Sequence, residues 1–178
     1  FGEPDSGDHE GVIYQHMTKL LLLGITGSGK SAISKPIGQA LGLKVLEVDQ
    51  EVIRLNNGLW PKDADTVSKY MLTTNDAALE MDGIVYVTSW LSRESMKQFY
   101  QKGFRIIELH ADFEELLRRK LKRDNPTQSE IDKFRENSKG YYEVINDKEI
   151  QPLITLSLDT TGMTIESAIK AIRLSALS

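Results

Sequence analysis

The stretch Gly24-Ile25-Thr26-Gly27-Ser28-Gly29-Lys30-Ser31 decides the fold of this chain. It fits the pattern of a glycine, any four residues, a second glycine, a lysine, and a serine or threonine. The apolar run of residues 20–23 leads into it, and apolar residues at helical spacing follow it over residues 31–41. A strand that passes through such a loop into a helix is typical of proteins that bind phosphate groups.

Each part of this phosphate loop has a physical reason to meet a phosphate. Glycines let backbone N–H groups turn onto phosphate oxygens, and the helix N-terminus adds a positive field. Lys30 reaches the terminal phosphates, and Ser31 offers a hydroxyl to Mg²⁺. The alternative is a glycine-rich turn that merely caps a helix. The binding residues are predicted to be Gly24, Thr26, Gly27, Ser28, Gly29, Lys30, Ser31 and Ala32.

Beyond the loop, short apolar segments alternate with amphipathic ones. This rhythm is typical of a parallel α/β domain, in which crossover helices join neighbouring strands. A helix over residues 31–41 is predicted to end at Gly42, a residue suited to the left-handed turn after a helix. The strands are predicted at residues 19–24, 44–48, 83–88, 104–110 and 153–158.

Two later helix starts carry capping signals. Asp112 and Glu115 are predicted to form one N-terminal capping pair, and Thr127 and Glu130 another. The helix between residues 124 and 147 is long and mostly polar, which predicts a mobile element rather than a central one.

Length and composition allow one domain. The chain has 178 residues, of which 40% are hydrophobic and 27% charged, so it is neither disordered by composition nor embedded in a membrane. Of its 26 Asp and Glu, four lie in residues 1–16, which hold no Lys or Arg, and the remaining 22 balance the 22 Lys and Arg. We expect residues 1–16 to be a disordered extension or a remnant of cloning, and residues 17–178 to form the single domain. The absence of cysteine excludes disulfides and fits a cytoplasmic protein.

Phosphate binding alone leaves several classes of protein open. A guanine-nucleotide switch usually carries Asn-Lys-any-Asp for its base, and the chain has no such tetrapeptide. Motors and multidomain ATPases generally need a longer chain. The predicted strand that reaches Val87 continues into Thr88-Ser89, where an acidic residue for Mg²⁺ would be usual in these classes. A compact kinase remains.

Four features resemble the small adenylate-kinase-like kinases, a group that includes shikimate kinases, gluconate kinases and nucleoside monophosphate kinases. They are the phosphate loop, its spacing to Glu47-Val48-Asp49, the basic cluster at residues 118–123, and Leu158-Asp159-Thr160-Thr161. The resemblance covers nearly all of residues 17–178, although only the loop is specific by itself. It implies a three-layer α/β/α P-loop kinase fold with a five-stranded parallel sheet of order 2-3-1-4-5. It also implies ATP as donor, Mg²⁺, and a helical lid at approximately residues 118–148.

The acid pair after the second strand is expected to face the ligand. Glu47 and Asp49 lie two residues apart at the carboxyl end of a strand, where open α/β sheets bind ligands. The resemblance to shikimate kinases implies that Asp49 orients or deprotonates the acceptor and that Glu47 lies near the metal. The alternative for Asp49 is an N-cap of the stretch at residues 50–55.

Four further residues are candidates for binding the acceptor. Arg54 could hold a phosphate or carboxylate with its planar guanidinium, or it could be a solvated surface residue. Arg93 follows the third strand, where monophosphate kinases often place an acceptor-binding arginine. Trp60 and Trp90 could form walls of the acceptor pocket, or they could belong to the core.

The basic cluster Arg-Arg-Lys-Leu-Lys-Arg at residues 118–123 is the predicted lid charge. The resemblance implies that Arg119 and Arg123, four residues apart, contact ATP and neutralise the phosphoryl group during transfer. The alternative is a solvated helix end that favours cations. By the same resemblance, residues 159–161 hold the adenine edge largely through the backbone, so the identity of their side chains says little about function.

The chain also departs from each well-marked member of this group. It has no Gly-Gly pair after the third strand and no recognisable arginine following Trp60, both expected of a shikimate kinase. The turn Thr88-Ser89-Trp90-Leu91 is similar to that of gluconate kinases, but their His-Phe lid signature is absent. The Asp-Gly-any-Pro-Arg element of adenylate kinases is also absent. None of these acceptors is therefore supported by the sequence.

We predict an ATP- and Mg²⁺-dependent phosphotransferase that transfers the γ-phosphoryl group to a hydroxyl of a small acceptor. In this prediction Lys30, Arg119 and Arg123 offset developing charge, and Asp49 handles the acceptor. A carboxylate placed to act as a base favours a hydroxyl acceptor, because a phosphate acceptor is already anionic and needs no deprotonation.

Three alternatives stay open. In a nucleoside monophosphate kinase, Arg54 and Arg93 would hold the acceptor phosphate. A kinase could instead act on a nucleic-acid hydroxyl at a strand end or modified base, although the neutrality of residues 17–178 disfavours extensive backbone contacts. A nucleotide-gated binding module would bind ATP without transferring phosphate.

Overall fold

The computed structural model describes residues 18–177, so the expectation for residues 1–16 lies outside the described residues. Five parallel strands form one sheet in the order β2-β3-β1-β4-β5, which confirms the predicted order. Each predicted strand is found within one residue of its expected ends. The strands are β1 (Lys19–Leu23), β2 (Lys44–Glu47), β3 (Ile84–Thr88), β4 (Arg105–His110) and β5 (Ile154–Asp159).

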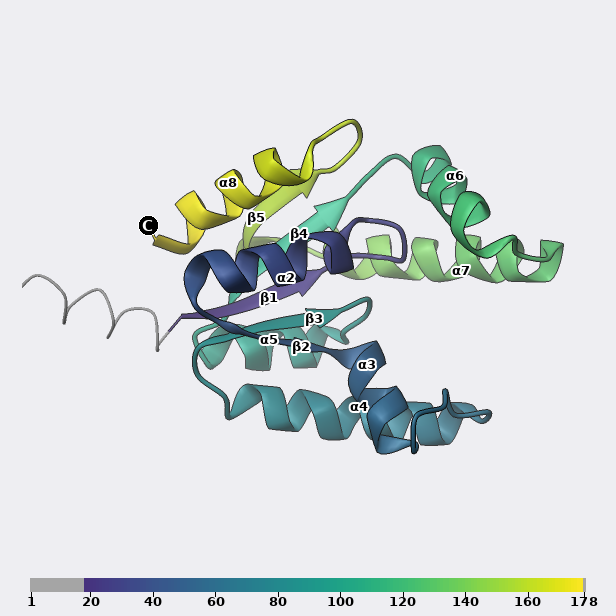
Figure 1. Cartoon of the computed structure of the whole chain (residues 1–178), viewed down its shortest axis with the longest axis horizontal. Coiled ribbons are helices and arrows are strands. Elements are labelled where there is room, and N and C mark those ends of the chain that lie inside the picture. Colours follow the sequence, from purple (N-terminus) through teal and green to yellow (C-terminus); the bar gives the residue numbers. More distant parts are fainter. Residues whose placement is uncertain (1–17, 178) are drawn as a thin grey trace, which may run out of the picture.

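Helices connect the strands and cover both faces of the sheet, as Figure 1 shows. They are α2 (Lys30–Leu41), α3 (Val48–Leu55), α4 (Ala64–Leu79), α5 (Arg93–Gln101), α6 (Phe113–Asp124), α7 (Gln128–Ile145) and α8 (Ile165–Leu177), with a 3₁₀ helix at Gln151–Leu153. None of the helices within residues 18–177 is long and apolar enough to cross a membrane.

The central strand shows why the sheet is buried on both faces. Leu20 and Leu22 of β1 pack with α2 and α8, whereas Leu21 and Leu23 pack with the helices of the opposite face. All four leucines are buried. Alternate side chains of a strand point to opposite faces, so a continuous apolar run suits a strand with helices on each side. The three-layer α/β/α architecture is thereby confirmed.

The connections gather the candidate residues at one edge. Helices α2, α3, α5 and α6 each follow the carboxyl end of a strand. The phosphate loop, the Glu47–Asp49 turn and residues 88–92 therefore lie at the carboxyl edge of the sheet, where open α/β sheets bind ligands.

The helix-capping predictions have mixed outcomes. Gly42 ends α2 in the left-handed conformation at φ 67°, and Thr127 forms a capping box with Glu130, as expected. Asp112 precedes α6, but its side chain makes no capping hydrogen bond, so the predicted pair with Glu115 is wrong. The Glu115 carboxylate instead accepts hydrogen bonds from arginines further along α6.

Helix α7 is more central than its polar composition suggested. Phe134, Tyr141, Val144 and Ile145 are buried in the core cluster on its side of the sheet. These positions recur on one face of a helix, and this narrow stripe is sufficient to bury it. The expectation that this helix is not central is therefore wrong for the second half of α7, while its mobility and the lid at about residues 118–148 stay predictions.

Candidate active site

Two adjoining cavities open at the carboxyl edge of the sheet. The first, here called the loop cavity, has a volume of about 1010 Å³ and is lined by the phosphate loop, the Glu47–Asp49 turn and α6. The second, the tryptophan cavity, has a volume of about 810 Å³ and is lined by Trp60, Trp90, the start of α4 and α7. Thr26, Trp60 and Ser89 line both. A ligand in one cavity can therefore reach a ligand in the other.

The phosphate loop adopts a backbone that requires glycine. Gly27 and Gly29 have φ values of 91° and 97°, in the left-handed region that L side chains rarely adopt. A Cβ at Gly24 would lie 2.4 Å from the carbonyl oxygen of Leu109. It would also lie 2.5 Å from Oγ of Ser28. The loop conformation is therefore a direct consequence of its glycine spacing.

Lys30 lies beneath the loop at the start of α2. Its side chain is buried, and its Nζ donates hydrogen bonds to the carbonyl oxygens of Gly24 and Ile25. Burial lowers the pKa of Lys30 to about 8, although the carboxylates of Asp49 and Glu47 oppose this shift. Burial leaves the ammonium poorly solvated, so a phosphate oxygen would stabilise its charge, whereas the two nearby carboxylates already offset part of that charge.

The two acids of the Glu47–Asp49 turn both line the loop cavity. The Glu47 carboxylate accepts a hydrogen bond of 2.6 Å from the hydroxyl of Ser34 on α2. Desolvation by the cavity walls raises the pKa of Asp49, and the Lys30 ammonium opposes the rise. Helix α3 begins at Val48 with Glu47 as its N-cap, so the alternative role of Asp49 as an N-cap is wrong.

The expected metal-binding residues also face the loop cavity. Ser31 lines it, and the hydroxyl of Ser31 makes no hydrogen bond within the described part of the chain. No group of three or more His, Cys, Asp and Glu side chains that could hold a metal occurs in residues 18–177. The donor set is thus one hydroxyl and the Glu47 carboxylate, with Asp49 beside them. Such a set fits Mg²⁺, which proteins often hold by one or two side chains while phosphates and waters complete its shell.

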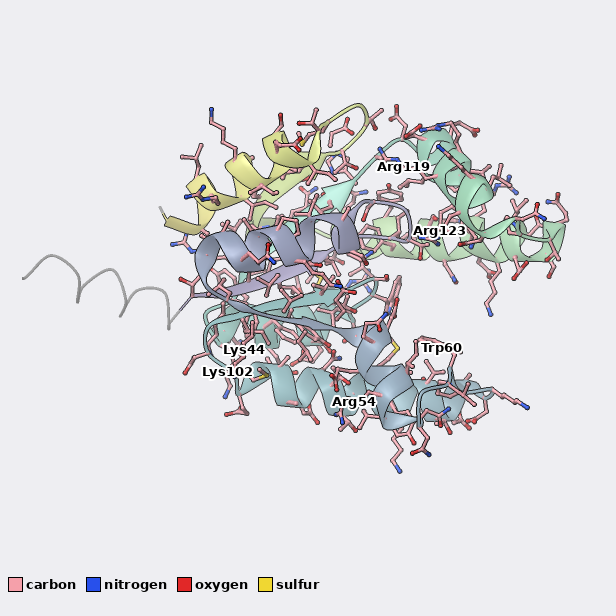
Figure 2. All side chains as sticks on the ribbon, in the orientation of Figure 1. Lys44, Arg54, Trp60, Lys102, Arg119 and Arg123 are labelled. Carbon is pink, nitrogen blue, oxygen red and sulfur yellow. The ribbon has the colours of Figure 1, made fainter. Side chains whose placement is uncertain are left out.

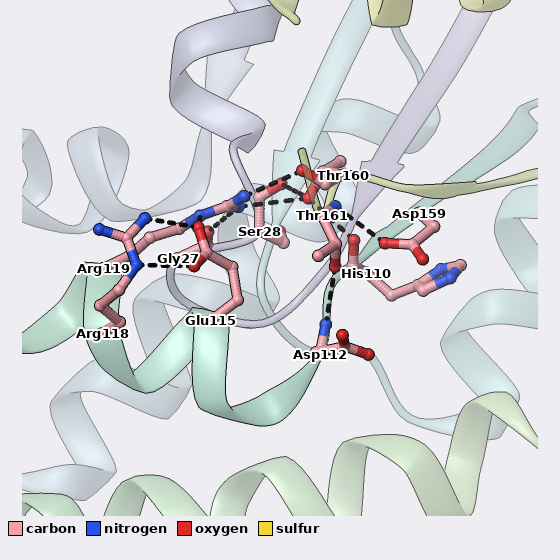
Figure 3. A network of polar contacts seen from close by, with 10 residues as sticks. All are labelled: Gly27, Ser28, His110, Asp112, Glu115, Arg118, Arg119, Asp159, Thr160 and Thr161. Carbon is pink, nitrogen blue, oxygen red and sulfur yellow. Dashed lines mark hydrogen bonds and ion pairs between the residues drawn. The ribbon is translucent and has the colours of Figure 1, made fainter. Parts of the chain in front are cut away.

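Arg119 joins α6 to the two loops that face it (Figure 3). Its guanidinium donates to the carbonyl oxygens of Gly27 and Thr160, each over 2.9 Å, and to Glu115 over 2.7 Å. It lines both the loop cavity and a third cavity of about 250 Å³ between the phosphate loop and α8. Arg119 therefore holds the loop and borders two cavities at once.

Arg123 lies one turn further along α6 and lines the loop cavity (Figure 2). Its guanidinium donates two hydrogen bonds to the carboxylate of Asp124, at 2.5 and 2.6 Å. Lys120 also lines this cavity and had not been singled out from the sequence, because its position in the cluster does not distinguish it. Three cations of α6 thus line the loop cavity.

Arg54 and Arg93 do not lie at either large cavity. Arg54 is exposed and pairs with Glu51 one turn earlier on α3, at 2.7 Å. Arg93 pairs with Asp147 after α7, also at 2.7 Å. The structure therefore brings neither arginine to these two cavities, whereas both tryptophans line the tryptophan cavity.

Thr160 has a larger role than the sequence suggested. Its side chain is buried, and its Oγ1 lies 2.8 Å from the carbonyl oxygen of His110 and 3.1 Å from that of Ser28. The same oxygen accepts a hydrogen bond from Arg119 over 3.3 Å. These contacts of Thr160 are long-range and leave no local sequence signal, so the sequence did not single out this side chain.

Comparison with known proteins identifies the fold. No protein-family model matches the chain, and no curated protein matches it in sequence. The shikimate kinase from Acinetobacter baumannii in complex with shikimate has a TM-score of 0.76 at 14% identity, covering 94% of this chain and 97% of that chain. The shikimate kinase from Aquifex aeolicus has a TM-score of 0.64 at 20% identity, covering 89% and 95%. A gluconokinase from Sinorhizobium meliloti has a TM-score of 0.64 at 16% identity, covering 91% and 93%. The chain has the fold of small P-loop kinases.

Proposed function

We propose that the protein is an ATP- and Mg²⁺-dependent kinase that transfers the γ-phosphoryl group of ATP to a hydroxyl of a small acceptor. The observation that carries the proposal is that the phosphate loop, Lys30, Asp49 and Arg123 all border one cavity. Phosphoryl transfer depends mainly on positioning and on neutralising spread negative charge, and this cavity supplies cations on two sides. The fold of the neighbouring kinases supports the same reaction type.

ATP is expected to lie across the phosphate loop. Its phosphates would occupy the loop cavity beside Lys30, and its adenine the third cavity, which is lined by Thr160 and the start of α8. Ser31 and Glu47 would hold Mg²⁺, which shields the charge of the β- and γ-phosphates. Arg119 and Arg123 would exchange part of their present hydrogen bonds for phosphate oxygens.

The acceptor is expected to lie in the tryptophan cavity with its hydroxyl directed at the loop cavity. The hydroxyl oxygen forms a bond to the γ-phosphorus, the bond between this phosphorus and the β–γ bridging oxygen breaks, and ADP leaves. The hydroxyl proton passes to the carboxylate of Asp49, whose raised pKa suits a group that accepts a proton. A nucleoside monophosphate acceptor is less well supported, because Arg54 and Arg93 are paired elsewhere.

The proposal is tested with labelled ATP and a panel of sugars, shikimate-like acids, nucleosides, nucleotides and oligonucleotides. We expect Mg²⁺-dependent transfer to at least one hydroxyl acceptor and loss of transfer in Lys30→Ala. Salt-sensitive transfer to oligonucleotides alone would instead favour a nucleic-acid kinase. ATP binding without transfer to any acceptor would contradict the proposal and favour a nucleotide-gated binding module.

A further inference from the structure

The tryptophan cavity has an unusual aromatic lining. The chain has two tryptophans, and both Trp60 and Trp90 line this cavity with 48% and 43% of their surface exposed. A Cβ placed on Gly140 of α7 would lie 3.5 Å from Cη2 of Trp90, so that this indole lies against the helix. Two half-exposed indoles at one cavity offer a large apolar surface with a polar N–H, which suits contact with a ring-bearing ligand.

The charges around this cavity cancel. Lys62 and Lys133 line it, and so do Asp63 and Glu136. No arginine lines it among the residues that the structure describes. A carboxylate or phosphate buried here would lack the bidentate partner that normally offsets its desolvation.

Neutral polar groups remain available to recognise a ligand. Asn137 lines the cavity, and the side-chain amide of Asn137 makes no hydrogen bond within residues 18–177. The hydroxyls of Ser68 and Ser89 also line the cavity without a partner in the described region. An amide offers both donors and an acceptor, so it can pair with an uncharged heterocycle or with hydroxyl groups.

We propose that the acceptor is an uncharged alcohol that carries a planar ring, which is the chemistry of a nucleoside. Its ring would contact the indoles of Trp60 and Trp90, and its polar edge would pair with Asn137. Its hydroxyl would reach the loop cavity through the wall shared at Thr26 and Ser89. This inference rests on the proposed function for the transfer step, whereas its claim about ligand charge concerns binding alone. It separates the acceptor from anionic acids such as shikimate and from nucleoside monophosphates.

Binding tests the claim independently of turnover. The intrinsic fluorescence of the protein comes mainly from the two cavity tryptophans, so quenching reports this site. We would titrate four nucleosides and their 5′-monophosphates, with shikimate and gluconate, in the presence of a non-hydrolysable ATP analogue and Mg²⁺. At least one nucleoside is expected to quench saturably and to bind about tenfold or more tightly than its monophosphate.

Substitutions test whether nucleoside binding takes place in the tryptophan cavity. Trp60→Ala is expected to weaken nucleoside binding measured by calorimetry, whereas Leu59→Ala is the matched control, because Leu59 is 72% exposed and does not line the cavity. Asn137→Lys adds one positive charge to the cavity. It should therefore reduce the difference in affinity between a nucleoside and its monophosphate.

The outcomes separate this inference from the proposed function. Equal or tighter binding of a monophosphate, shikimate or gluconate would overturn the inference, as would the absence of quenching by every nucleoside. Nucleoside binding without ATP-dependent transfer to any acceptor would instead contradict the proposed function and leave the charge selectivity of the cavity established.

Discussion

Arg119 of α6 donates a hydrogen bond to the carbonyl oxygen of Gly27 over 2.9 Å and so ties the helix after β4 to the phosphate loop after β1. The two residues, Arg119 and Gly27, are 92 positions apart in the sequence. Thr160 completes this arrangement from the loop after β5, as Figure 3 shows. The carboxyl ends of three strands are held together by one guanidinium.

Arg119→Ala is expected to weaken MgATP binding. Hydrogen bonds from a charged group each contribute about 1.5–3 kcal/mol, so loss of the proposed contact between Arg119 and a phosphate oxygen should lower affinity by about tenfold or more. Arg118→Ala is the control, because Arg118 pairs with the same Glu115 but is 64% exposed and does not contact the loop. Calorimetric titration with MgATP measures both. An equal loss of MgATP affinity in the two variants would contradict a specific role of Arg119 in binding ATP.

Lys30→Met is expected to stabilise the free protein while removing ATP binding. Burial lowers the pKa of Lys30 from 10.5 to about 8, which corresponds to about 3 kcal/mol as an upper bound on the cost of the buried charge. The gain should be largest below pH 8, where the ammonium is protonated in both states. It should shrink between pH 8 and 10.5, where only the unfolded chain still binds the proton.

Thermal unfolding of Lys30→Met and wild type at several pH values tests whether the variant is more stable and whether its gain shrinks as the pH rises. Lys35→Met on the exposed side of α2 is the control, with a change within about 0.5 kcal/mol and no such pH dependence. A Lys30→Met protein that is less stable than wild type at pH 7 would show that the two carbonyl hydrogen bonds of Lys30 outweigh its desolvation.

Asp49→Asn is expected to lower turnover about 10²-fold or more while leaving MgATP affinity nearly unchanged, because a general base acts only in the transfer step. Desolvation raises the pKa of Asp49, so the acidic limb of the pH–rate profile should lie above the ordinary range of a carboxyl group and disappear in the variant. Glu51→Gln is the control, since Glu51 pairs with Arg54 outside the loop cavity. Full turnover by Asp49→Asn would exclude the base assignment.

Thr160→Val is expected to destabilise the fold by about 1–3 kcal/mol, because the carbonyl oxygen of Ser28 loses its contact with the buried hydroxyl. The carbonyl oxygen of His110 is less affected, because it still accepts a hydrogen bond from the backbone N–H of residue 160. Thr161→Val is the matched control, because Thr161 is exposed and its hydroxyl contacts the exposed residues Asp112 and Asp159. Urea unfolding of both variants measures the difference, and comparable losses would show that the buried hydroxyl has no special role.

The predictions from sequence succeeded where the signal was local. The phosphate loop could be located because its glycines, Lys30 and Ser31 are contiguous and the backbone angles follow directly from the residue types. The strands were found within one residue because each is a short apolar run bounded by helix signals. Helix α7 was misjudged because a narrow buried stripe is enough to hold a helix whose average composition is polar.

The proposed acceptor side depended in part on the tertiary structure. Arg54 and Arg93 were plausible ligands by position, yet Arg54 pairs with Glu51 one turn earlier on α3, and Arg93 pairs with Asp147, 54 residues away. Helical spacing could have suggested the first pair, whereas nothing in the spacing of the chain shows that Arg93 meets Asp147. Similarly, Trp60 and Trp90 share a cavity only because α4 and α7 lie on its two sides.

The sequence by itself determined that this chain carries a phosphate-type loop between a buried strand and a helix, because that geometry depends on eight consecutive residues. Only the tertiary structure decided what surrounds that loop. It placed Arg119 and Thr160 on the loop and left a neutral, tryptophan-lined cavity beside it. The reason is physical: a loop conformation is set by local backbone sterics, whereas a cavity is made by side chains from distant elements that meet only in the folded sheet.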